Sequence, residues 1–64
     1  MKTLADYEQF AKDEGEECID GIVSFTTQNA ANDFADKATR KQFPVWTQKT
    51  EEAGRIFFNV QYIG

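Results

Sequence analysis

The sequence predicts a single α+β domain spanning residues 1–64, in which two helices pack with a three-stranded antiparallel sheet. Two stretches carry apolar residues at helical spacing, and three others alternate with the period of two that is typical of strands. A domain of 64 residues buries only about 60% of its unfolded surface. We therefore expect one small core, built largely from the six Phe, two Tyr and one Trp.

The first helix is expected over about residues 4–14. Thr3 followed by Asp6 resembles a capping box, with an acid in the first turn where the helix dipole favours it. Apolar residues then recur at helical spacing, namely Leu4, Tyr7, Phe10 and Ala11. Gly15 is a natural end for this helix.

The period changes to two over residues 17–25, which predicts the first strand. Gly21, inside this stretch, indicates either a bulge or the close approach of a neighbouring segment. Thr26 and Thr27 then provide capping groups for a second helix near residues 28–41. Its apolar face is mostly alanine, with Ala31, Phe34, Ala35 and Ala38, so this helix is able to lie close to a sheet.

The remaining segments predict a hairpin, with strands over 45–50 and 55–63 and a four-residue turn at 51–54. Residues 55–63 are apolar on both faces and are placed in the middle, which gives the order α-β-α-β-β and the sheet order 1-3-2. This architecture is half of a ferredoxin-like sheet with an added N-terminal helix. The turn pairs Thr50 with Arg55, while a one-residue slip would turn Trp46 to the other face.

Charge is distributed unevenly along the chain. Residues 1–36 hold two basic and nine acidic residues, a net charge of −7. Residues 37–64 hold five basic and two acidic residues, a net charge of +3, so the whole chain carries −4. Such an imbalance is able to steer a partner of opposite charge.

The composition argues against an enzyme. The chain has no His, and Cys18 is its only cysteine, which leaves neither the usual general base nor a set of soft metal ligands. Acidic neighbours, Glu17 and Asp20, would raise the pKa of the Cys18 thiol rather than lower it. We expect Cys18 to be a buried or half-buried structural residue, and we expect neither a metal nor another cofactor.

A lone thiol fits a reducing compartment, so a cytoplasmic location is expected. The first ten residues carry acids where a signal peptide needs its apolar region, and the apolar stretches are too short for a membrane span.

The first candidate surface is an acidic run, made of Asp13, Glu14, Glu16, Glu17 and Asp20. It has three readings: a solvated face, a docking patch for a partner with a basic groove, or a weak divalent-cation site. The calcium-loop pattern fails, because its third, sixth and twelfth positions would be Gly15, Cys18 and Ser24.

The second candidate surface is one face of the sheet. If both helices covered the same face, the other would carry Cys18, Ile22, Phe57 and Ile63, with Trp46 joining Phe57 in the preferred register. Such an open aromatic face would be a partner or dimer surface. In the competing arrangement one helix covers each face and nothing is left open.

The third candidate is a nucleic-acid site. It would use Trp46 and Phe57 for stacking and a basic set for phosphates, namely Lys37, Arg40, Lys41, Lys49 and Arg55. The isoelectric point of about 4.5 disfavours it, because the acidic half would repel a phosphate backbone.

Together these features predict a non-catalytic protein-binding module, such as a small inhibitor or regulatory protein. Its size and charge resemble those of phage and mobile-element accessory proteins that block host machinery. The expected contact residues are the acidic run together with Trp46 and Phe57. A homodimer joined through the sheet is the alternative, and a nucleic-acid-binding module comes third.

Overall fold

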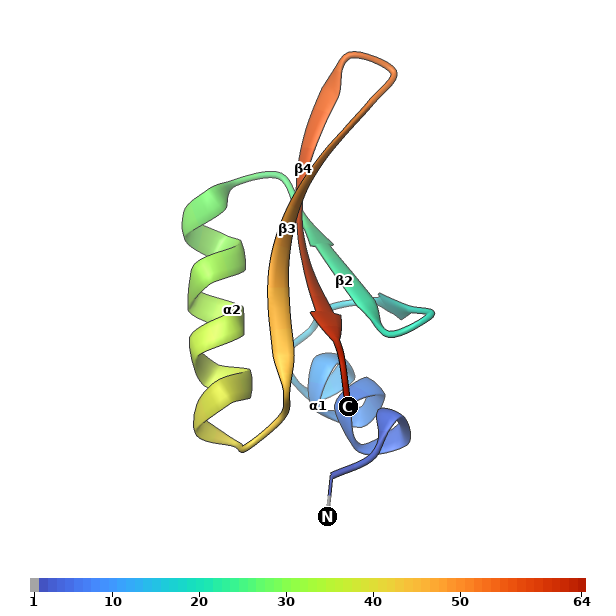
Figure 1. Ribbon diagram of the computed structural model, residues 1–64, viewed down its shortest axis with the longest axis vertical. Coiled ribbons are helices and arrows are strands. Elements are labelled where there is room, and N and C mark those ends of the chain that lie inside the picture. The colour runs from blue at the N-terminus through green and yellow to red at the C-terminus, as the bar shows by residue number, and fades with distance from the viewer. Residues whose placement is uncertain (1) are drawn as a thin grey trace.

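A computed structural model describes residues 2–64 and confirms the α+β class (Figure 1). The elements in chain order are α1 (Leu4–Asp13), β1 (Cys18–Ile19), β2 (Ile22–Phe25), α2 (Gln28–Arg40), β3 (Val45–Glu52) and β4 (Arg55–Tyr62). The strands form one antiparallel sheet in the order β1-β2-β4-β3. The expected count of three strands and the order 1-3-2 are therefore wrong, although β4 does lie between β2 and β3.

Local capping interactions start both helices. The Thr3 hydroxyl accepts a hydrogen bond from the Asp6 backbone N–H at 3.2 Å, and the Thr3 N–H donates to the Asp6 carboxylate at 3.0 Å. This reciprocal pair is the predicted capping box. For α2 the cap is Thr27, whose hydroxyl accepts from the Ala30 N–H at 3.2 Å.

The extra strand arises because residues 17–25 fold as a hairpin. Asp20 and Gly21 have φ angles of 53° and 78°, the left-handed pair that a two-residue type I′ turn requires. Ile19 therefore pairs with Ile22, and Cys18 pairs with Val23. The Gly21 position is also crowded, since a Cβ there would lie 3.1 Å from the Leu4 Cδ1 atom.

The second hairpin, β3–β4, also has a shorter turn than expected. Ala53 and Gly54 form it with φ angles of 52° and 78°, so Glu52 rather than Thr50 lies opposite Arg55. Trp46 consequently pairs with Gln61. Because the shift from the predicted register is two residues, it preserves the face of every side chain.

Both helices pack on the same face of the sheet, so the three-layer arrangement does not occur. Tyr7 of α1 lies at the centre, with its ring 6.1 Å from that of Phe34 in α2 and 5.6 Å from that of Phe43. Its hydroxyl donates to the Val60 carbonyl of β4 at 2.8 Å. The buried core consists of Tyr7, Ala11, Val23, Ala31, Phe34, Ala38, Phe43 and Val60.

The alanines of α2 are what bring this helix close to the sheet. Ala31 and Ala38 are almost completely buried, as is Phe34 between them. The far end of the β3–β4 hairpin extends beyond both helices, in the upper part of Figure 1. The molecule is therefore elongated, with extents of 38 × 20 × 20 Å.

Candidate functional site

The sheet face opposite the helices is the main candidate surface, and we call it the open face. Side chains alternate between the two faces along each strand. Val23 and Val60 are buried under the helices, so the residues whose side chains point to the other side of the sheet form the open face. By the observed register the open face comprises Ile19, Ile22, Ser24, Trp46, Gln48, Thr50, Glu52, Arg55, Phe57, Asn59 and Gln61. Trp46 and Phe57 share it, as the sequence predicted.

Trp46 is the most prominent aromatic group on the open face. Its side chain is 51% exposed, while its indole N–H donates to the Gln61 side-chain oxygen at 3.0 Å. The polar atom of the ring is thus satisfied within the chain, and the apolar ring surface meets solvent. Because Gln61 also pairs with Ile22 of β2, Trp46 belongs to a cross-strand row that ends at Ile19 of β1.

A short hydrogen-bonded network occupies the middle of the open face. The Ser24 hydroxyl donates to the Asn59 side-chain oxygen at 2.7 Å, and the Asn59 amide donates to the Thr50 hydroxyl at 3.0 Å. Half-buried Phe57 lies opposite Thr50. The network joins three strands, so we expect it to hold the polar side chains of this face in fixed positions.

The structure divides the predicted acidic run into two groups. Asp13 and Glu14 close α1 and bind side chains of the chain itself. Asp13 accepts from the Gln9 amide, and Glu14 forms an ion pair with Lys37 of α2, both at 2.9 Å. Glu14 also raises the pKa of the Lys37 ammonium, through their hydrogen bond and its negative charge.

The other three acids border the open face at its β1 edge. Glu16, Glu17 and Asp20 line a groove of about 540 Å³ together with Ile19, Ile22 and Ser24. Ile19 is 61% exposed. Sequence reasoning did not select Ile19 as a contact residue, although the Asp20-Gly21 pair, a strong hairpin signal, would have placed it beside Ile22.

One residue expected on the open face, Cys18, lies on the helix-covered side. Cys18 pairs with Val23 and shares its face, where it packs half-buried against the core. The turn at residues 20–21 explains this correction, because it reverses the chain between Cys18 and Ile22. Ile63 follows the end of β4 and is exposed.

The Cys18 thiol is poorly suited to nucleophilic chemistry. Burial raises its pKa most strongly, a hydrogen bond donated by the Gly21 backbone N–H partly opposes this, and the negative charges of Glu8 and Asp20 raise the pKa further. The thiolate, which is the reactive form, is therefore disfavoured at neutral pH. The pKa is raised, as predicted, but burial is the main cause, and of the two acids expected to raise it only Asp20 does so.

The predicted basic set is dispersed over the molecule. Lys37 pairs with Glu14, and Arg40 pairs with Asp36 at 3.0 Å within α2. Lys49 lies on the helix-covered side of β3, so Arg55, opposite Glu52, is the one member of the set on the open face. This arrangement offers no continuous basic track beside Trp46.

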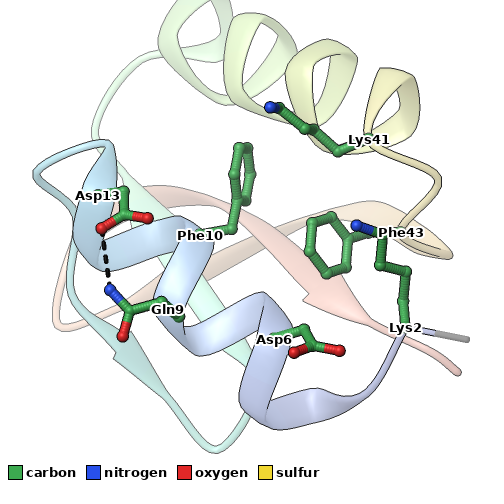
Figure 2. A pocket seen from close by; sticks show the side chains of 7 residues that line it. All are labelled: Lys2, Asp6, Gln9, Phe10, Asp13, Lys41 and Phe43. Carbon is green, nitrogen blue, oxygen red and sulfur yellow. Dashed lines mark hydrogen bonds between the residues drawn. The ribbon is translucent and has the colours of Figure 1, made fainter.

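A second hollow lies between α1 and the C-terminal end of α2 (Figure 2). It is lined by Lys2, Asp6, Gln9, Phe10, Asp13, Lys41 and Phe43. Its two carboxylates already have structural roles, since Asp6 completes the cap at Thr3 and Asp13 accepts from Gln9. Lys2 lies over the Phe43 ring, with its Nζ 4.9 Å from the ring centroid. We interpret this hollow as the seam where the two helices meet.

Within residues 2–64, no group of three or more Cys, Asp or Glu side chains is arranged to hold a metal ion. No helix in the described part of the chain is both long and apolar enough to cross a membrane. Comparisons with protein-family models, with curated proteins and with solved structures return no match.

Proposed function

We propose that this protein is a non-catalytic binding module, an inhibitor or regulatory protein that docks onto a partner protein through the open face. One observation carries the proposal: both helices pack on a single side, which leaves Ile19, Ile22, Trp46 and Phe57 uncovered. Exposed apolar groups that lie together on one surface are characteristic of interaction sites.

The chemistry of the open face suits protein recognition. Trp is among the residue types most enriched at binding hot spots, and the hydrogen bond to Gln61 restrains the Trp46 ring before any partner arrives. The network of Ser24, Asn59 and Thr50 is similarly ordered. A partner would therefore bind a largely preformed surface.

A photocrosslinking experiment tests this proposal. Benzoylphenylalanine placed at Gln48, an exposed residue of the open face, should cross-link a partner in lysate of the source cells. The matched control carries the same group at Thr39, an exposed position on α2. We expect a product from position 48 alone, and we expect Trp46→Ala to abolish it. The same product from both positions, or none from position 48, would contradict the proposal.

A homodimer joined edge to edge is the second candidate, and the position of β3 favours it. This eight-residue strand forms one border of the sheet. In an antiparallel hairpin alternate residues point their backbone groups outward, which here are those of Val45, Thr47, Lys49 and Glu51. Lys49 on this edge opposes such pairing. Light scattering at millimolar protein concentration decides the matter, because a strict monomer excludes the dimer.

A further inference from the structure

The groove at the β1 edge of the open face combines an apolar floor with a rim of one charge. Ile19 and Ile22 are cross-strand partners and provide the apolar floor. Glu16, Glu17 and Asp20 add three carboxylates, and the lining contains no basic residue. Glu14, which precedes these acids in the chain, differs from them because it is paired with Lys37.

We propose that this groove binds a basic, apolar segment of the partner protein, in which lysine or arginine residues flank an aliphatic side chain. The aliphatic group would cover Ile19 and Ile22, and the cations would lie against the three carboxylates. This proposal deepens the proposed function and rests on it. Charge complementarity is the argument for this occupant.

A second copy of the chain fits the groove less well. The chain carries a net charge of −4, so two copies repel at this surface. Three of its seven basic residues also have partners away from the groove: Lys37 is bound to Glu14, Arg40 is bound to Asp36, and Lys2 lies over the Phe43 ring. Phe43, the large apolar residue that follows Lys37, Arg40 and Lys41 in the chain, is buried in the core.

The test uses a blocked octapeptide that alternates lysine and valine, titrated into isotopically labelled protein. We expect the largest amide shift changes at Ile19, Ile22 and Ser24, and weaker binding at higher salt. Peptides that alternate glutamate with valine, or lysine with serine, should bind much more weakly. The four-strand row of Ile19 to Trp46 spans about 14 Å, so Trp46 emission should change little.

Two charge-matched triple variants separate the groove from general electrostatics. The groove variant carries Glu16→Gln, Glu17→Gln and Asp20→Asn, and the control carries Asp33→Asn, Asp36→Asn and Glu51→Gln. Each changes the net charge from −4 to −1. We expect the groove variant to bind the lysine–valine peptide about tenfold more weakly and the control to bind as the wild type does. Asn is chosen at position 20 because it tolerates the left-handed backbone.

Several outcomes would overturn the inference. One is equal loss of binding in both variants, and another is shift changes that avoid Ile19 and Ile22. A third is equal binding of the lysine–serine peptide, which would show that charge attraction alone accounts for the binding and that the aliphatic side chains contribute nothing. If the peptide test fails while the cross-link from Gln48 persists, the open face binds a partner of different chemistry. If the peptide binds but no cross-link forms, the proposed function fails instead.

Discussion

The two faces of this sheet are built from the same strands but have different roles. On β4, Phe58 and Val60 point toward the helices, whereas Phe57 and Asn59 point away from them. The helix-covered face forms an aromatic core around Tyr7. The open face carries a hydrogen-bonded network of Ser24, Asn59 and Thr50 and exposes the apolar groups of Ile19 and Trp46. The comparison teaches that stability resides mainly on one face, so the other is free to be shaped for contact.

The largest expected effect comes from the core. Phe34→Ala should lower the free energy of unfolding by about 3–5 kcal/mol, because it leaves a cavity beside the rings of Tyr7, Phe10 and Phe25. A loss of this size is enough to unfold most of a domain this small. Urea denaturation followed by circular dichroism measures it. A loss below about 1 kcal/mol would show that the helix-covered face does not supply most of the stability.

Alkaline pH should lower the stability that the helix-covered face provides. Burial raises the pKa of Tyr7 above its ordinary value, and the Cys18 charge adds to this shift. In the unfolded chain Tyr7 ionises above about pH 10. The stability that its burial provides is therefore fully present below that pH. Above it, the free energy of unfolding falls by up to about 1.4 kcal/mol per pH unit. Cys18, whose pKa is also raised, gives the same sign from about pH 8.5.

Urea denaturation at pH 7 and at pH 11 tests this dependence, with Tyr7→Phe as the control. The variant loses the hydrogen bond to the Val60 carbonyl, which should cost about 1 kcal/mol at pH 7. Its stability should then change less with pH than that of the wild type. An equally steep decline in the variant would place the titrating group elsewhere.

On the open face a comparable truncation should cost less. Trp46→Ala is expected to lower stability by about 1 kcal/mol, because the ring is half exposed and lies on an outer strand. Its effect on the cross-link from Gln48 should nevertheless be complete. A variant that unfolds as readily as Phe34→Ala would assign Trp46 a core role and remove the distinction between the faces.

The smallest effect concerns the backbone conformation of the two turns. Ala53 adopts a left-handed φ of 52°, a conformation that strains a residue with a Cβ. Ala53→Gly should therefore stabilise the fold by about 0.5 kcal/mol. The reciprocal change Asp20→Ala in the other turn should destabilise it by a similar amount. Thermal unfolding of both variants checks the pair, and shifts in the same direction would contradict the explanation.

Local signals account for most of what the sequence predicted correctly. The cap at Thr3 and the alanine spacing of α2 involve residues within two helical turns, and both occur as expected. Two turn assignments were wrong for different reasons. Asp20-Gly21 is a recognised hairpin pair that was read as the interior of a strand, whereas Ala53 gives no sign of its left-handed conformation.

The placement of the helices was beyond local reasoning. Both faces of the sheet carry apolar residues, so periodicity alone does not choose between them. The choice depends on contacts such as Tyr7 with Val60, which are 53 positions apart. The acidic run was divided for the same reason, because Glu14 finds its partner, Lys37, on the other helix.

One contact near the ends of the chain has a practical consequence. The Tyr62 hydroxyl donates to the Lys2 carbonyl at 2.9 Å, so the first and last described segments lie side by side, at the opposite end from the β3–β4 turn (Figure 1). A short peptide linker should therefore be able to join them, and the backbone could be reopened between Ala53 and Gly54. Such a circular permutant would keep every strand neighbour while bringing the new termini to the protruding tip.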